Sequence, residues 1–163
     1  MKAFLFGIAA FFLGLFIWLF CHDYNLNHMH YAQLRTTAEE ASVAATLFTY
    51  PQEEREGRIV FNQVEGHKAI TAMLIAMLKT DDSLSPVEGS YWQDKITYTA
   101  YFFDDLNTSY PQTFTDPETG FRFVIQRPSV IVTVNAGKAR YTINGTVDNT
   151  ANIRSAAHEI VGW

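Results

Sequence analysis

Three histidines in the N-terminal third are the first residues whose types could hold a metal ion. His28 and His30 are separated by one residue, and His22 lies upstream beside Asp23. No Pro or Gly interrupts this stretch, so we expect a helix, in which residues two apart point about 200° away from each other. One ion therefore cannot bind both His28 and His30, and we predict no metal site here.

Two acidic stretches, "FFDDLN" and "TDPETG", offer the carboxylate oxygens that calcium prefers. Their acidic residues are Asp104, Asp105, Asp116 and Glu118. Neither stretch has the alternating ligand spacing of a calcium loop, whereas acidic residues commonly stabilise turns through their own backbone. We expect turns, with calcium binding as the alternative.

No catalytic motif is present. The chain has no G-x-S-x-G, no P-loop and no H-E-x-x-H pattern. Its single cysteine, Cys21, excludes an intramolecular disulfide. Asn107 and Asn144 each begin a short glycosylation acceptor pattern, which often arises by chance. We predict that the protein is not an enzyme and that it uses no cofactor.

The composition is that of a chain with a hydrophobic core. Aromatic residues make up 15% of the 163 residues and charged residues only 18%, the opposite of a disordered chain. The formal net charge is −5, and no basic stripe is present to contact phosphates. We therefore expect no nucleic-acid partner.

The run from Ala3 to Cys21, "AFLFGIAAFFLGLFIWLFC", has the length and composition of a membrane span. It carries no charged side chain, and as a helix it would be about 28 Å long. A cleaved signal peptide would need small residues near its end, where this run has large ones, so we expect an uncleaved anchor. Lys2 precedes the run and no Lys or Arg follows before Arg35, which predicts a cytoplasmic N-terminus and an extracytoplasmic head on a single-pass protein of the cytoplasmic membrane.

The helix is expected to continue beyond the membrane, because no residue breaks it before Pro51. One stripe of residues keeps helical spacing from Phe20 to Phe48, which predicts a helix of about 70 Å from near Ala3 to near Thr49. The stripe contains three alanines, and such a slim face can pack on the protein's own head, on neighbouring subunits, or on both at different heights.

Within the membrane, three small residues at spacings of three and four can bring a second helix close. Together with the stripe they make up the predicted assembly face: Gly7, Ala10, Gly14, Phe20, Tyr24, Tyr31, Leu34, Ala38, Ala41, Ala45 and Phe48.

The remaining residues, 51–163, are expected to form the head. After a linker, "PQEEREG", the pattern predicts a short strand, "RIVFN", and then a helix capped by Asn62 with Glu65 in capping-box spacing. That helix has an apolar stripe with core spacing, formed by Ile70, Met73, Leu74, Met77 and Leu78.

The period then changes to two, which predicts antiparallel strands at "KITYTAYFF", "FRFVIQ", "SVIVTV" and "ARYTI". Turns are expected at "TDPETG" and at "NAGK", the second closing a hairpin. The last segment reads either as an edge strand or as a short helix capped near Asp148. The sequence thus predicts an α+β fold with two parts, a helical anchor and stalk over residues 1–50 and a head over residues 51–163.

In its first 50 residues the chain resembles the pilin-like proteins of tight-adherence systems, the TadE and TadG type. The resemblance lies in the order of "DYNLNHMHYAQLRTTAEEASVAATLF" after a hydrophobic helix, with Asp23, Tyr31 and Leu34 followed by an alanine-rich phrase. It implies a pilin-like or minor-pilin subunit of a bacterial envelope filament, secretion or conjugation machine. Its partners would be the membrane and either copies of itself or other pilin-like subunits.

A second hypothesis is a membrane-anchored extracytoplasmic binding module. Four aromatic residues, Tyr91, Trp92, Tyr98 and Tyr101, could form its binding surface. The alternative role for the same residues is in the core and in cross-strand pairs.

Overall fold

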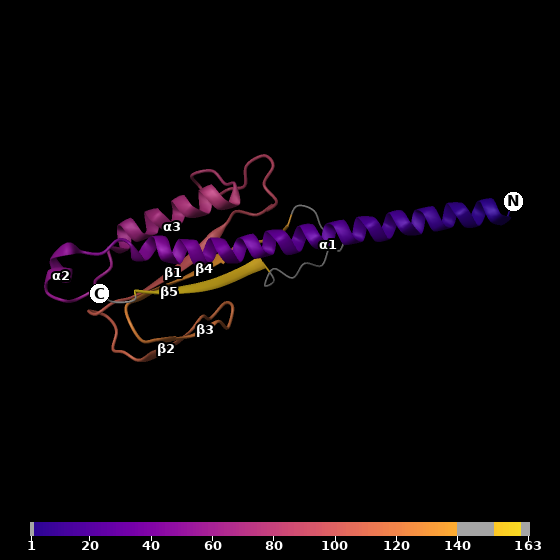
Figure 1. Ribbon diagram of the computed structural model, residues 1–163. Coiled ribbons are helices and arrows are strands. Elements are labelled where there is room, and N and C mark those ends of the chain that lie inside the picture. Colours follow the sequence, from indigo (N-terminus) through magenta and orange to yellow (C-terminus); the bar gives the residue numbers. More distant parts are fainter. Residues whose placement is uncertain (1, 140–151, 161–163) are drawn as a thin grey trace.

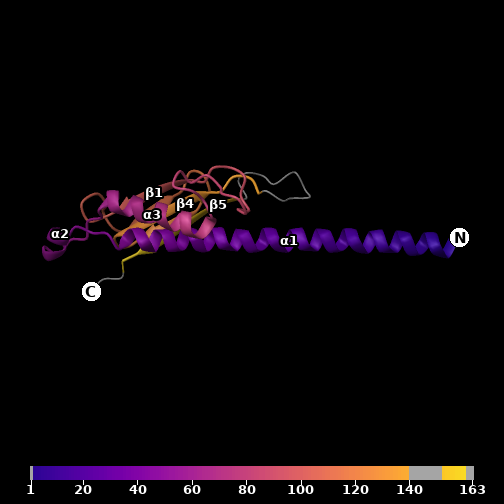
Figure 2. The ribbon, with the colours of Figure 1, turned by 90° about the horizontal axis from the view of Figure 1, so that it is seen from above.

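A computed structural model describes residues 2–139 and 152–160. The helices are α1 (Lys2–Thr46), α2 (Pro51–Arg55) and α3 (Gln63–Leu78), and the strands are β1 (Thr97–Phe103), β2 (Gln112–Thr115), β3 (Arg122–Ile125), β4 (Ser129–Asn135) and β5 (Ile153–Glu159). The head lies along the C-terminal half of α1, and the N-terminal half of α1 extends beyond it (Figures 1 and 2). This confirms the predicted α+β fold with a long N-terminal helix.

Helix α1 is continuous for 45 residues because nothing in the sequence interrupts its backbone hydrogen bonding. The hydroxyls of Thr37, Ser42 and Thr46 on its buried face each donate to a carbonyl three or four residues back in the same helix. These bonds satisfy polar groups that burial would otherwise make costly. The helix ends three residues earlier than predicted, so Phe48 lies outside it. The Phe48 carbonyl accepts a hydrogen bond from the Asn62 amide at 2.9 Å.

The segment between α1 and α3 differs from the prediction. The expected linker contains α2, because Pro51 suits the first position of a helix and Glu53 and Glu54 interact favourably with its N-terminal dipole. The expected strand "RIVFN" is wrong, since its residues form only an isolated bridge between Phe61 and Thr49.

Helix α3 begins as predicted, with the Asn62 side chain accepting a hydrogen bond from the Glu65 amide at 3.3 Å. Ile70, Leu74 and Leu78 on its predicted stripe are buried. Helices α1 and α3 pack side by side, and the Gln33 side chain of α1 donates to the Met77 carbonyl of α3. The expected core helix is therefore confirmed.

Two antiparallel sheets complete the head. The larger has the order β1-β4-β5, and β2 pairs with β3 as a hairpin. The turn predicted at "TDPETG" is present and closes that hairpin, whereas neither the hairpin nor β2 was predicted. The described part of the last segment, residues 152–160, contains an edge strand, β5, and not the alternative short α-helix. The predicted strand "ARYTI" beyond Ala139 and the predicted cap at Asp148 lie outside the described residues.

The three-stranded sheet is covered on both faces. Val130, Val132 and Val134 of β4 are fully buried in a core shared with α1 and α3. On the opposite face, the hydroxyls of Thr133 and Ser155 form hydrogen bonds with residues of the β2–β3 turn. Helices therefore cover one face and the hairpin covers the other, and the core draws on both predicted parts of the chain.

Candidate functional site

The histidines of α1 lie in separate aromatic contacts. His28 stacks on Tyr24, and the His30 ring stacks on Tyr91 with 4.0 Å between ring centroids. His30 Nδ1 is also 3.0 Å from the Gln33 side-chain oxygen. In the part of the chain that the structure describes, no three His, Cys, Asp or Glu side chains gather in a way that could hold a metal ion.

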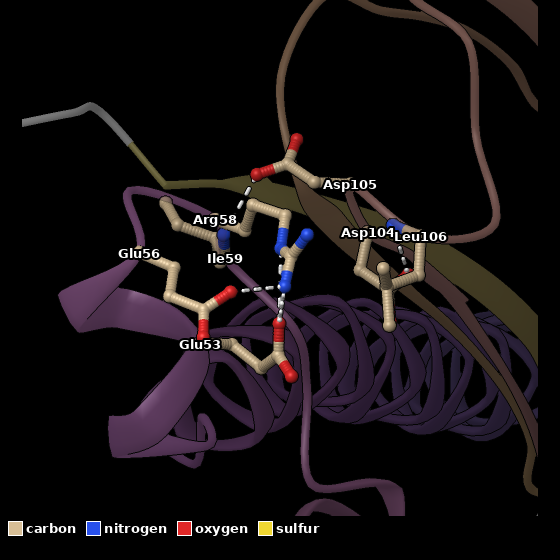
Figure 3. Close-up of polar contacts among 7 residues, drawn as sticks. All are labelled: Glu53, Glu56, Arg58, Ile59, Asp104, Asp105 and Leu106. Carbon is tan, nitrogen blue, oxygen red and sulfur yellow. Dashed lines mark hydrogen bonds and ion pairs between the residues drawn. The ribbon is translucent and has the colours of Figure 1, made fainter.

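The acidic loop at residues 104–105 holds backbone groups. Asp105 Oδ2 accepts from the Ile59 amide at 2.7 Å, and Asp104 Oδ1 accepts from the Leu106 amide at 3.1 Å (Figure 3). The first bond ties the loop after β1 to the segment before α3. These carboxylates stabilise the turn and the loop by accepting backbone hydrogen bonds, which is the role that the sequence predicted for them.

Beside this loop, Arg58 bridges two carboxylates of the α2 region. Its guanidinium lies 2.7 Å from Glu53 and 2.5 Å from Glu56 (Figure 3). The hydrogen bond and charge of Glu53, followed by the charge of Glu56, raise the pKa of Arg58 above its usual value. Because Arg58 and Glu56 are exposed and Glu53 is partly exposed, the contacts fix a local turn and contribute little stability.

Asp116 is the buried carboxylate of the second acidic stretch. It is 1% exposed, and its Oδ1 accepts from the amides of Glu118 and Thr119 at 2.8 and 2.9 Å, while the Thr133 hydroxyl donates to Oδ2. Burial alone raises the pKa of Asp116, but these hydrogen bonds outweigh it and hold the pKa below its usual value. Asp116 thus joins the hairpin turn to β4.

Within the described residues, nothing covers the N-terminal half of α1. One helix among the described residues, α1, is long and apolar enough to cross a membrane. Of the predicted assembly face, Gly7, Ala10 and Gly14 are exposed, and a Cβ added at either glycine would meet no other atom within 4 Å. Phe20 and Tyr24 are exposed as well. This part of the face is open to a second helix.

The C-terminal half of the predicted face packs inside the head. Leu34, Ala38, Ala41 and Ala45 are all 0% exposed and belong to the hydrophobic core. Of the two roles that the sequence left open for the alanines, packing on the protein's own head is therefore the one that the structure shows at these four positions.

Tyr31, one turn before Leu34, is half-buried, and the Arg154 guanidinium of β5 lies 3.7 Å above its ring centroid. Phe48 remains 40% exposed at the far end of the head. Tyr31 and Phe48 are therefore less buried than the alanines that lie between them in the sequence.

The small-residue face and the head lie on different sides of α1. At about 100° per residue, Gly7, Ala10 and Gly14 are centred about 140° around the helix from the stripe of Leu34, Ala38, Ala41 and Ala45. The same rule puts Ala9 on the head side of the helix. A second helix can thus approach the small-residue face without meeting this protein's head.

The aromatic residues proposed for a binding surface lie mainly inside the molecule. Tyr91 and Trp92 are 6% and 2% exposed and belong to the core. The Tyr98 hydroxyl lies 3.1 Å from His67 Nδ1, and the Tyr101 ring packs on Phe114 with 4.6 Å between centroids. The core role is therefore confirmed for Tyr91 and Trp92, whereas Tyr98 and Tyr101 are half-buried and contact α3 and the β2–β3 hairpin.

A groove that the sequence did not predict runs beside β5. Its volume is about 570 Å³. Helix α1, β5 and the β2–β3 hairpin line it with Arg35, Glu39, Phe121, Phe123, Arg154, Ser155, Ala156 and Ala157. These residues come from three distant parts of the chain, and no local pattern in the sequence joins them.

Comparison with known proteins identifies no relative of this chain. No protein-family model, curated protein or solved structure matches it. Function is therefore inferred from the chemistry and geometry of the chain's own residues.

Proposed function

We propose that the protein is a pilin-like structural subunit of a bacterial envelope filament, secretion or conjugation machine, which assembles through its N-terminal helix. The observation that carries this proposal is the single helix α1, whose N-terminal half is apolar and uncovered while its C-terminal half is part of the core of the head. The TadE-like order of the first 50 residues supports the same function.

Continuity of α1 gives the subunit a mechanical property that a tether lacks. Because Leu34, Ala38 and Ala41 are fully buried against the head, any force or displacement on the N-terminal half of α1 is transmitted to the head. A flexible linker would instead allow the head to rotate independently. A subunit that must hold a fixed position in an assembly benefits from the rigid connection.

Assembly would use the open small-residue face. In a bilayer, helices associate through close van der Waals packing, which small residues allow, and not through a hydrophobic drive. Gly7, Ala10 and Gly14 offer this packing on a side of α1 turned away from the head. In the proposed orientation the N-terminus is cytoplasmic and the head is extracytoplasmic, following the position of Lys2.

The proposal is tested by comparing Ala10→Leu with Ala9→Leu in cells that produce the protein naturally. Both changes add the same bulk to neighbouring lipid-facing positions, but only Ala10 lies on the small-residue face. The mass of the membrane-extracted complex should fall to that of the monomer for Ala10→Leu and stay unchanged for Ala9→Leu. A wild-type protein that is extracted only as a monomer, or an equal effect of the two changes, would refute helix-driven assembly.

A second candidate function, a membrane-anchored binding module, is favoured by one observation, the groove beside β5. In that case the helix serves as an anchor only. Ala10→Leu would then leave both the complex and its ligand binding unchanged, whereas changes in the groove would abolish binding.

A further inference from the structure

In the part of the chain that the structure describes, the outer edge of β5 presents unpaired backbone groups. The Asn152 carbonyl accepts from Ala136, and the Ile160 amide donates to Pro128, so both residues face β4. Because the direction of backbone groups alternates along a strand, Ile153, Ser155, Ala157 and Glu159 direct their N–H and C=O groups away from β4. Among the described residues, the Arg154 side chain, which donates to the Ile153 carbonyl, is the one partner on this edge.

The side chains around this edge leave it accessible. Ser155, Ala156 and Ala157 in the middle of β5 are small, and the strand contains neither the Pro nor the Lys with which proteins commonly block a free edge. The groove follows the edge along these residues. An added strand can therefore reach the backbone of β5.

The two walls of the groove differ in chemistry. One wall is charged and consists of Arg35, Glu39 and Arg154, with Arg35 and Glu39 paired at 2.9 Å. In the described part of the chain Arg154 has no carboxylate partner, and its guanidinium lies over the Tyr31 ring. The other wall is apolar and consists of Phe121 and Phe123, whose rings stack at 6.2 Å.

We propose that this groove binds an extended segment of a partner protein, which adds to β5 as a further strand and carries alternating acidic and apolar side chains. The backbone edge of β5 provides the hydrogen bonds. Successive side chains of a strand point to opposite sides, so the acidic ones face Arg154 and the apolar ones face the two phenylalanines. This inference goes beyond helix assembly and holds whether or not α1 associates with other helices.

The test uses the full-length protein in detergent micelles and two fluorescent peptides. The first is acetyl-Thr-Val-Asp-Val-Asp-Val-Thr-amide, and the second has Lys in place of both Asp residues. Fluorescence anisotropy should show that the Asp peptide binds at least about tenfold more tightly than the Lys peptide. Arg154→Glu should reverse this preference. Equal binding of the two peptides, or binding of neither, would overturn the proposal.

Proline substitutions test the strand-addition geometry. Ala157→Pro removes an N–H that faces the groove, so it should abolish peptide binding and keep the head folded. Ala156→Pro removes an N–H that bonds to β4 and should destabilise the head. N-methylation of alternate peptide residues gives the same test without changing the protein. Methylation of the amides that face β5 should abolish binding, and methylation of the amides that face away should not.

Two results would overturn the inference even if the peptides bind. If Ala157→Pro leaves peptide binding unchanged, the peptide does not pair with β5. If sedimentation of the protein alone shows a dimer that Ala157→Pro converts to a monomer, the occupant is a second copy of the chain and not an acidic partner segment.

Discussion

Removing the Leu34 side chain should destabilise the head strongly, because Leu34 joins helix α1 to the hydrophobic core. Leu34 is 0% exposed. Leu34→Ala removes about three carbon groups, which costs roughly 2.4 kcal/mol of transfer free energy, and the cavity left behind adds roughly 1 kcal/mol. We expect the free energy of unfolding to fall by about 3.5 kcal/mol.

Urea unfolding of the full-length protein in micelles measures this loss. Trp92 is 2% exposed and reports on the core once the other two tryptophans are replaced by Trp18→Phe and Trp163→Phe. With an m-value of about 2 kcal/mol/M, the midpoint should fall by about 1.7 M for Leu34→Ala.

The matched control is Leu47→Ala, one residue beyond the end of α1. Leu47 is 75% exposed, so its removal should change stability by less than about 0.5 kcal/mol. Equal midpoints for Leu34→Ala and Leu47→Ala would refute the conclusion that α1 is part of the core of the head.

Two further predictions concern the turns of the head. Gly137 and Gly120 both have positive φ, but a Cβ at Gly137 would lie 2.6 Å from Asp94 Cβ, whereas one at Gly120 would meet nothing within 4 Å. Gly137→Ala should therefore lower the thermal unfolding midpoint clearly more than Gly120→Ala. Equal shifts of the midpoint would contradict the close approach of Gly137 to Asp94. Asp116 has a folded-state pKa below its unfolded value, so its charge contributes stability that is present above about pH 4 and is lost as pH falls through the folded pKa. Asp116→Asn should lower the free energy of unfolding at neutral pH by about 1–3 kcal/mol and reduce the further loss of stability at acidic pH. Urea titrations at several pH values from neutral to acidic would detect both effects. An unchanged dependence of stability on acidic pH would contradict the role of the Asp116 hydrogen bonds.

The parts of the fold that the sequence predicted correctly are those with long, regular patterns. The uninterrupted run to Pro51 specified α1, and the Asn62 cap with the apolar stripe after it specified α3. Alternation over several residues identified β1 and β4 in the same way. In each case one local pattern repeats over enough residues to outweigh competing signals.

The parts that were missed are short or depend on distant contacts. Helix α2 has five residues and β2 has four, too few for a periodic pattern to appear. The "RIVFN" segment has the composition of a strand, but its neighbour in space is the loop after α1, so it forms only a bridge. A short apolar run does not specify which partner it will find.

Neither the packing of the alanines nor the groove could be settled from the sequence. A slim alanine face fits equally well against a sheet or against another helix, and burial of Ala38 and Ala41 in the head is set by the strands that follow them in the chain. The groove requires Arg35, Phe121 and Arg154 to meet, and only the packing of α1 and of the β2–β3 hairpin around β5 brings them together.

The most direct test of the central claim is a distance between two spin labels on α1 in a lipid bilayer. The native Cys21 is exposed and is the single cysteine of the chain, and Glu40→Cys adds a second exposed site 19 residues further on. An unbroken helix predicts one narrow distance distribution with backbone positions about 28 Å apart. A broad distribution extending to shorter distances would show a hinge between membrane and head, and would contradict the rigid connection on which the proposed function depends.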